Sequence, residues 1–227
     1  MDVVYLVRRG NVNEELRFSL RSLVNLPHDR VWTVGYKPNW LTGVEHIPGN
    51  RCQSKWLNVY DNLRIAASEV EADEFIVMND DFFVVNPVAG VPTRHRGYLI
   101  DHISSVGSGS WKRSLMATFD FLRANGFRRP LSYDLHIPIT MEREKLGEVL
   151  EIAWRKSTIP VQWRSLYGNW WRVPSTLRRD VKVRRAQIKD EWGPGADFVS
   201  TDDYSFGRAE VGAWLRQRFP DKSEFEK

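Results

Sequence analysis

The first 90 residues alternate between short apolar runs and longer amphipathic stretches, and this alternation restricts the possible folds more than any other feature of the chain. Val3–Val7, Val31–Val34 and Phe75–Met78 have the composition and length of buried strands. Glu14–Leu26 and Trp56–Val70 carry apolar residues at helical spacing. Strands that alternate with helices predict an α/β fold with a mostly parallel sheet covered on both faces.

The second half of the chain has a weaker pattern, and we predict a less regular C-terminal half. We expect helices at Trp111–Asn125, Met141–Ala153 and Arg208–Phe219, and strands at Gly97–Ile100 and Phe198–Thr201. The aromatic segment Trp163–Val173 is expected to be irregular, and the tail around Asp221–Lys227 to be disordered.

The composition is that of an ordinary globular protein, with 227 residues of which 42% are hydrophobic and 27% charged. The net charge of +4 is compatible with nucleic acid, an anionic membrane surface or a phosphorylated substrate. Cys52 is the only cysteine, which excludes an internal disulfide and a cysteine-rich zinc site and favours a reducing compartment. The N-terminus lacks signal-peptide features, and no apolar run approaches the roughly 20 residues that span a bilayer, so we expect a cytoplasmic protein.

Two adjacent carboxylates, Asp80 and Asp81, follow the strand Phe75–Met78 directly, with Asn79 before them. Open α/β sheets bind ligands at the carboxyl ends of their strands. Adjacent carboxylates need positive compensation, and Mg²⁺ or Mn²⁺ supplies it while bridging phosphates. Glycosyltransferases of the GT-A type use an acidic motif at such a strand end. The motif therefore predicts a site for a divalent metal and a diphosphate, and the alternative is a solvated turn.

Three other positions are candidates for the same site. His136 is a candidate base, phosphate partner or metal ligand, or an ordinary histidine in an extended turn. Arg164 lies among aromatic residues, which suits phosphate recognition or a structural cation–π contact. Asp202 and Asp203 form a second acidic pair after a strand-like run, and they serve either the site or the start of a helix.

Basic and aromatic residues gather in the second half of the chain. The basic run consists of Arg178, Arg179, Lys182, Arg184, Arg185 and Lys189. Such a run contacts a polyanion or forms a solvated face. Six tryptophans, Trp154, Trp163, Trp170, Trp171, Trp192 and Trp214, are interpreted mainly as packing residues, with stacking on sugars or bases as the alternative.

The order of these motifs resembles that of the Stealth family, whose sugar-phosphate transferases include bacterial capsule polymerases and GlcNAc-1-phosphotransferase. The similarity covers nearly the whole chain in compact form, and its most specific block is the second. The similar segments are Asp2–Tyr5, Glu15–Leu23, Asn39–Leu41, Phe75–Phe83 with Pro87, His136–Pro138 with Lys145, Trp163–Ser165, and Val199–Asp203.

The resemblance implies a single GT-A-like catalytic domain over residues 1–227, with the donor bound by residues 1–90 and the acceptor served by residues 91–227. It implies transfer of a hexose-1-phosphate from a nucleotide sugar, such as a UDP-sugar, to a hydroxyl of a glycan or protein acceptor. Asp80, Asp81 and Asp202 would hold the metal, and Asn79 and Asp80 would face the donor. His136, Arg164 and Asp203 would be catalytic.

The chain departs from the family in its first block, which usually carries Trp-Val-Asp/Asn-Gly. Here the loop reads Arg8-Arg9-Gly10, and we expect these residues to contact the donor phosphates directly. Three alternatives stay open: an ordinary GT-A glycosyltransferase, an enzyme that modifies nucleic acid, and a binding module without activity.

Overall fold

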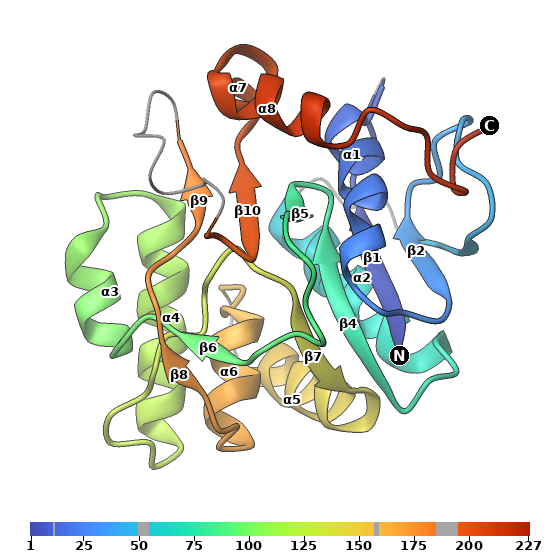
Figure 1. Ribbon diagram of the computed structural model, residues 1–227. Helices are drawn as coiled ribbons and strands as arrows, with labels where there is room; N and C mark the ends of the chain where they lie inside the picture. The colour runs from blue at the N-terminus through green and yellow to red at the C-terminus, as the bar shows by residue number, and fades with distance from the viewer. Residues whose placement is uncertain (11, 50–54, 157–158, 185–194) are drawn as a thin grey trace.

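The computed structural model describes residues 1–10, 12–49, 55–156, 159–184 and 195–227 (Figure 1). Within these residues the main sheet has the strand order β3-β2-β1-β4-β7. β1 is parallel to β2 and β4, β2 is parallel to β3, and β7 is antiparallel to β4. The strands are β1 (Asp2–Val7), β2 (Val31–Gly35), β3 (Glu45–Pro48), β4 (Glu74–Asn79) and β7 (Ile139–Glu142). The predicted mostly parallel sheet is confirmed.

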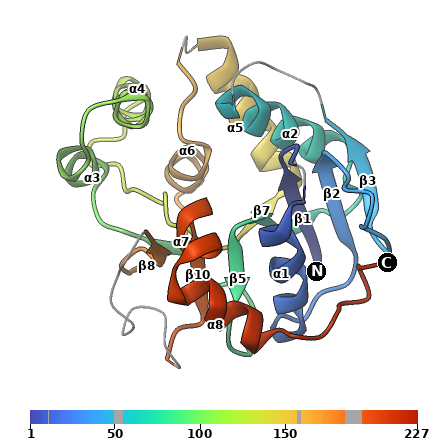
Figure 2. The ribbon, with the colours of Figure 1, turned by 90° about the horizontal axis from the view of Figure 1, so that it is seen from above.

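Helices cover both faces of this sheet, as Figure 2 shows. Because strand side chains alternate, Val4 and Val77 point to the face of α2 (Lys55–Glu69) and α5 (Arg143–Lys156), whereas Val3 and Tyr5 point to α1 (Glu14–Ser22). β1 is buried along its whole length, which explains why its sequence is almost purely apolar.

Two smaller sheets complete the fold. β5 (Phe82–Val84) leaves the main sheet after the Asn79–Asp81 turn and pairs antiparallel with β10 (Phe198–Thr201). β10 is parallel to β9 (Lys182–Val183), and β6 (Arg94–His95) is parallel to β8 (Thr176–Leu177). The remaining helices are η1 (Leu23–Asn25), α3 (Leu99–Ser105), α4 (Ser110–Ala124), α6 (Trp163–Trp170), α7 (Asp203–Arg208) and α8 (Glu210–Arg218). None of the described helices is long and apolar enough to cross a membrane.

Two of the local predictions are wrong, and one predicted helix has its start misplaced. The segment Gly97–Ile100 is not a strand, because α3 begins at Leu99. Trp163–Trp170 is a regular helix, and its Gly168 is required because a Cβ there would collide with the Tyr133 ring. Met141 belongs to β7, so the helix predicted from that residue begins at Arg143.

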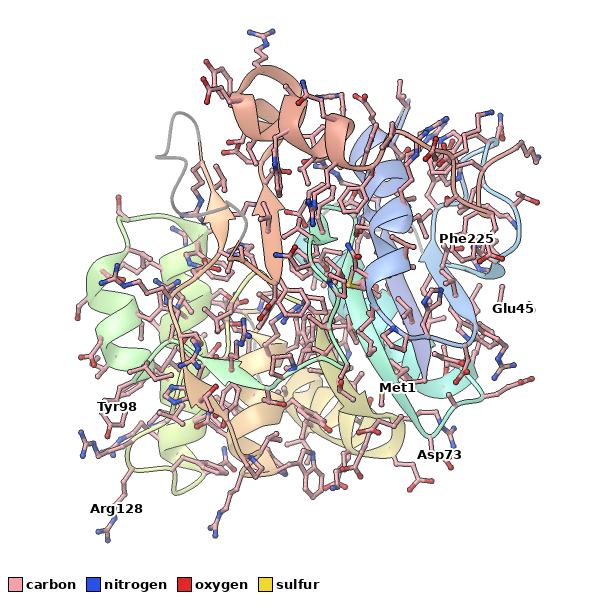
Figure 3. All side chains as sticks on the ribbon, in the orientation of Figure 1. Met1, Glu45, Asp73, Tyr98, Arg128 and Phe225 are labelled. Atoms are coloured by element: carbon pink, nitrogen blue, oxygen red, sulfur yellow. The ribbon has the colours of Figure 1, made fainter. Side chains whose placement is uncertain are left out.

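The C-terminal tail is packed, contrary to the prediction of disorder. Phe225 enters the core on the α1 side of the sheet, and Glu226 accepts hydrogen bonds from Arg21. Figure 3 shows Phe225 beside β2, at the opposite side of the molecule from Tyr98 and Arg128, which lie at the outer end of the α3–α4 pair. The tail therefore helps to hold α1 in place.

Candidate active site

A cavity of about 1280 Å³ opens at the carboxyl ends of β1, β2 and β4. Residues from both halves of the sequence line it. From the first half come Leu6, Val7, Arg8, Arg9, Glu15, Gly35, Tyr36, Lys37, His46, Pro48, Gly49, Asn58, Val59, Asn62, Asn79, Asp80 and Asp81. From the second half come His136, Lys182, Thr201, Asp202, Asp203 and Tyr204. Eight of the predicted site residues thus share one cavity, whereas Gly10 and Arg164 are not among those that line it.

Asp80 and Asp81 occupy the turn between β4 and β5, and they lie at the edge of the sheet because β4 ends at Asn79. The pKa of Asp80 is raised to about 6, because burial and the adjacent charge of Asp81 together outweigh the opposing charge of Arg8. The pair therefore concentrates negative charge on the floor of the cavity.

Arg8 is the cation that faces this charge from the end of β1. Its guanidinium lies 2.6 Å from an Asp203 oxygen, 3.4 Å from Asp80 and 3.7 Å from Glu15. One guanidinium is thus shared by three carboxylates. Arg9 also lines the cavity. Gly10 lies behind these residues, packed against the Asn13 side chain, whose Nδ2 donates to the Arg8 carbonyl oxygen at 3.0 Å.

The antiparallel pairing of β5 with β10 brings the end of β10 to the start of β5. Ser200 is the register partner of Phe82, and the Thr201 N–H donates to the Asp81 carbonyl oxygen at 3.3 Å. Lys182, on the neighbouring β9, donates to both the Asp81 carboxylate and the Thr201 carbonyl oxygen. Asp81 therefore has its own buried cation, separate from Arg8.

Glu15, in the first turn of α1, is a site residue that the sequence analysis did not single out. The Thr201 hydroxyl donates to its Oε1 at 2.8 Å. The pKa of Glu15 is raised to about 8: burial is the largest cause, the charges of the neighbouring carboxylates add to it, and the Thr201 hydrogen bond opposes it. At neutral pH Glu15 is thus mostly protonated. An acidic residue in the first helical turn usually interacts with the helix dipole. The sequence therefore did not distinguish a site role for Glu15 from this ordinary helical role.

Asp202 and Asp203 differ in role although they are adjacent. Asp202 caps α7, since its Oδ1 accepts from the Ser205 N–H at 2.8 Å. Asp202 therefore has the role at the start of a helix that the sequence offered as the alternative to a site role. Asp203 points to Arg8 instead. Both residues line the cavity.

His136 reaches the cavity from the segment between Tyr133 and Pro138. The Asp180 carboxylate accepts from the His136 backbone N–H at 2.9 Å and lies 2.8 Å from its Nδ1. Asp180 was missed by the sequence analysis because it lies inside the basic run. The histidine is therefore held by a carboxylate, as the bases of many active sites are.

Arg164 is buried behind the cavity. Its guanidinium carbon lies 4.6 Å from the centre of the Trp163 ring and 5.4 Å from that of Phe82. Neither Nη atom has a hydrogen-bond partner within the described part of the chain. Burial lowers the pKa of Arg164 to about 10, and the charges of Asp134 and Asp180 oppose this decrease. The contacts of Arg164 are thus those of a structural cation–π residue, which was the alternative to phosphate recognition.

The carboxylate oxygens of Asp80 and Asp81 are suitable ligands for Mg²⁺ or Mn²⁺. Over the described ranges, however, no three His, Cys, Asp or Glu side chains are gathered so as to hold a metal. Asp80 faces Arg8 and Asp81 faces Lys182. The described residues therefore offer part of a ligand set, namely Asp80 and Asp81.

The basic run does not form one uniform face. Arg178 and Arg179 are exposed, Lys182 pairs with Asp81, and Arg185 and Lys189 lie outside the described residues. Trp163 is in the core, with Trp170 and Trp171 packed against it, so these three serve packing. Trp192 lies outside the described residues.

Comparison with solved structures identifies the fold. The galactosyltransferase LgtC, in complex with donor and acceptor sugar analogues, is similar over 99% of this chain and 98% of its own, with a TM-score of 0.57 and 10% identity. An active-site mutant of LgtC gives a TM-score of 0.55, also with 10% identity and with 99% and 98% coverage. A glycosyltransferase involved in glycosylation of the major capsid of PBCV-1 gives only 0.48, with 12% identity and 95% and 98% coverage.

The fold is thus a mixed α/β fold of the GT-A glycosyltransferase kind. At these identities the similarity defines the fold and not the reaction. No protein-family profile matches the sequence, and no curated protein matches it. Membership of the Stealth family therefore stays a prediction.

Proposed function

We propose that this protein is a nucleotide-sugar-dependent transferase that moves a hexose-1-phosphate, or a hexose, to an acceptor hydroxyl. The observation that carries the proposal is the gathering of Arg8, Asp80, Asp81, His136 and Asp203 in one cavity at the strand ends of a GT-A fold. Ligands of open α/β sheets bind at this position. The cavity contains anionic, cationic and imidazole groups, which are the groups that phosphate binding and proton transfer require.

The nucleoside end of the donor is best accommodated beside β2 and β3. Gly35 has a φ of +112°, and side chains at Gly35 or Gly49 would collide with Val7 or Asn62. Asn62 Oδ1 is buried without a hydrogen-bond partner among the residues that the structure describes. A buried acceptor without a donor is costly, so a ligand N–H or O–H group would stabilise it. These features support binding of a base or ribose here.

The diphosphate is best accommodated beside Arg8 and Asp80, which both line the cavity. Five Asp or Glu side chains and four Lys or Arg side chains line the cavity, and Glu15 is mostly protonated at neutral pH. The lining is therefore almost balanced before a ligand enters, and a diphosphate adds about two negative charges. A divalent cation held by Asp80 and Asp81 would offset this charge, with donor oxygens as its remaining ligands. The Asp202 part of the predicted metal set is less suited, because its Oδ1 already caps α7.

In the proposed reaction His136 accepts the proton of the acceptor hydroxyl as the acceptor oxygen forms its new bond. Attack on the distal phosphorus breaks the bond to the bridging oxygen, and a nucleoside monophosphate leaves with the electron pair. Attack on the anomeric carbon breaks the glycosidic bond, and a nucleoside diphosphate leaves. Arg8 lies where it can balance charge on the phosphoryl oxygens, and Asp203 holds Arg8.

The position of Arg164 favours the second candidate, transfer of the hexose alone. This arginine was expected to serve the phosphate that is attacked, but it is buried against Phe82 and Trp163 and is not among the cavity-lining residues. If Arg164 serves the attacked phosphate, as the resemblance implies, it would have to act indirectly, because it does not line the cavity.

The two parts of the chain have different roles in the proposed function. We propose that residues 1–90 bind the donor, because 17 of the 23 lining residues belong to them. Residues 91–227 then supply His136, Lys182 and Asp203 and serve an acceptor glycan or protein. A cytoplasmic location and the secondary option of a nucleic-acid acceptor stay predictions from sequence.

Donor binding is tested by a thermal-shift panel of nucleotide sugars with and without Mn²⁺. The matching nucleotide sugar should raise the melting temperature by an amount that grows with the logarithm of the ligand concentration once it exceeds Kd, and Mn²⁺ should enlarge the shift. Asp80→Asn should lose the Mn²⁺-dependent part. No shift with any nucleotide or nucleotide sugar would contradict the proposal.

The transferred group is tested by identifying the released nucleotide with a donor that binds. A nucleoside monophosphate indicates sugar-1-phosphate transfer, and a nucleoside diphosphate indicates hexose transfer. Free nucleotide in the absence of acceptor is the control for hydrolysis.

A further inference from the structure

Asp180 contacts two groups of His136, its backbone N–H and its imidazole ring. Its Oδ1 accepts from the His136 backbone N–H at 2.9 Å, and its Oδ2 lies 2.8 Å from the His136 Nδ1. A single carboxylate thus fixes both the backbone and the ring of the histidine. Neither side chain is widely exposed, with 25% for His136 and 15% for Asp180.

The position of Asp180 is itself fixed. Its Oδ1 also accepts from the Val181 N–H at 2.9 Å, directly before β9, and Arg96 Nη1 lies 3.7 Å from Oδ2. Burial raises the pKa of Asp180, but hydrogen bonds from His136 and the charges of His136 and Arg96 outweigh burial, so the pKa lies below its ordinary value. Asp180 is therefore an ionised acceptor at neutral pH.

An ionised carboxylate can only accept hydrogen bonds, so the His136 nitrogen that faces it carries a proton. Nδ1 is protonated, and Nε2, on the other side of the ring, is the nitrogen with a free lone pair. The Phe82 ring meets the imidazole edge to face, with the ring centres 6.3 Å apart. Because His136 lines the cavity, Nε2 is the nitrogen left for a ligand.

We infer that Asp180 is a positioning residue, which holds His136 in the Nδ1–H form so that Nε2 accepts the proton of the acceptor hydroxyl. This inference rests on the proposed function for its role in turnover. The proton moves from the acceptor oxygen to Nε2 as that oxygen bonds to the donor, and the electron pair of the broken bond leaves with the nucleotide. Asp180 stays ionised and balances the imidazolium that forms.

The structural part is tested in the protein alone, by long-range ¹H–¹⁵N NMR of the His136 ring above pH 8. The wild-type protein should show the proton on Nδ1. In Asp180→Ala a substantial Nε2–H population should appear, because the carboxylate no longer selects the tautomer. Asp197→Asn is the matched control, since Asp197 pairs with Arg94 away from His136. A wild-type ring protonated on Nε2, or no change in Asp180→Ala, would overturn the inference.

The catalytic part is tested by steady-state kinetics of Asp180→Asn, which preserves side-chain shape. The amide can donate to Nδ1 and so favours the wrong tautomer. The expected loss is about 100-fold or more in kcat with KM within about threefold. Asp180→Glu should recover part of kcat, whereas a purely structural role predicts a lower melting temperature with unchanged kcat per folded molecule. Absence of transferase activity in the wild type would refute the proposed function and leave the NMR result to stand by itself.

Discussion

Two charged clusters flank α1, and they balance charge in opposite ways. At the C-terminal tail one buried carboxylate, Glu226, serves two guanidiniums, with contacts of 2.7 and 2.9 Å to Arg21 and 3.2 Å to Arg17. At the cavity one guanidinium, Arg8, serves three carboxylates at 2.6–3.7 Å. The Glu226 side chain is fully buried, whereas 64% of the Arg8 side chain is exposed.

The Glu226 cluster has the features of a structural ion pair, whereas the Arg8 cluster has those of a binding site. A buried carboxylate with bidentate guanidinium contacts is fully satisfied and leaves nothing for a ligand. An exposed guanidinium among more acids than it can pair leaves these acids partly uncompensated. Burial, together with the charges of neighbouring carboxylates, raises the pKa of Glu15 and of Asp80. Raised carboxyl pKa values therefore distinguish the cavity from the tail. At the tail burial raises the pKa of Glu226, but hydrogen bonds from Arg21 and Ser223 and the charges of Arg21 and Arg17 outweigh burial, so the pKa is lowered.

The largest effect on stability is expected from Glu226→Ala. Removal of this carboxylate leaves Arg21 largely buried without its partner, and breaking a buried pair costs about 3 kcal/mol or more. Urea denaturation should show this decrease in the free energy of unfolding. The exposed Glu224→Ala is the control and should change it little. Equal values for the two variants would show that the tail does not support α1.

The opposite behaviour is expected at the cavity. Asp80→Asn should lower transferase kcat/KM by about 100-fold, which corresponds to about 2.7 kcal/mol of transition-state stabilisation. The melting temperature should stay constant or rise, because a carboxylate with a raised pKa is removed. Asp73→Asn, just before the other end of β4, is the control for activity. A large loss of stability in Asp80→Asn would mean that the turn is structural.

The pH dependence of stability should report the raised pKa of Glu15. The pKa of Glu15 is about 8 in the folded protein against an ordinary 4.5, so the folded state holds a proton that the unfolded state has released. The free energy of unfolding must therefore fall as pH rises from about 4.5 to about 8, and the decrease levels off above the folded-state pKa. Burial lowers the pKa of His102 to about 4, which acts in the opposite sense only below about pH 6.5.

Melting curves of the wild type and Glu15→Gln across this window test the effect. The slope should be shallower in Glu15→Gln, because the neutral amide cannot titrate. Parallel curves would show that Glu15 is not the group responsible.

The smallest effect is expected for a pair that belongs to neither cluster. Arg216 forms two hydrogen bonds of 3.0 Å to Glu14, but both side chains are substantially exposed. Glu14→Ala should cost at most about 1 kcal/mol in the same urea experiment. A loss as large as that of Glu226→Ala would show that burial does not determine how much an ion pair contributes to the stability of this protein.

The sequence was sufficient for the parts of the molecule that local pattern determines. β1, β2 and β4 are apolar because both faces of the sheet are covered, and a strand that ends in Asn79-Asp80-Asp81 must place its acids at the sheet edge. His136 and Asp203 were candidates from their residue types, but only the resemblance to a family favoured a site role for them over that of ordinary polar residues.

The remainder depends on tertiary contacts that have no local signal. Lys182 and Asp180 lie in a basic run, and only the pairing of β9 with β10 shows that one faces Asp81 and the other His136. Glu15 resembles any acid in a first helical turn. Trp163–Val173 was expected to be irregular because of its aromatic residues, yet Trp163–Trp170 is a helix, and Gly168 is what lets this helix pack against Tyr133.

The hydrogen bond between Arg8 and Asp203 joins positions 195 residues apart, nearly the two ends of the chain. Contacts of such high sequence separation are slow to form, because a long loop must close before they contribute. During synthesis the strands β1–β4 leave the ribosome long before Asp180, Lys182 and Asp203. The parallel half of the fold can therefore assemble first, and a chain interrupted before β9 would retain its strands and its Asp80-Asp81 turn without the partners that complete the site.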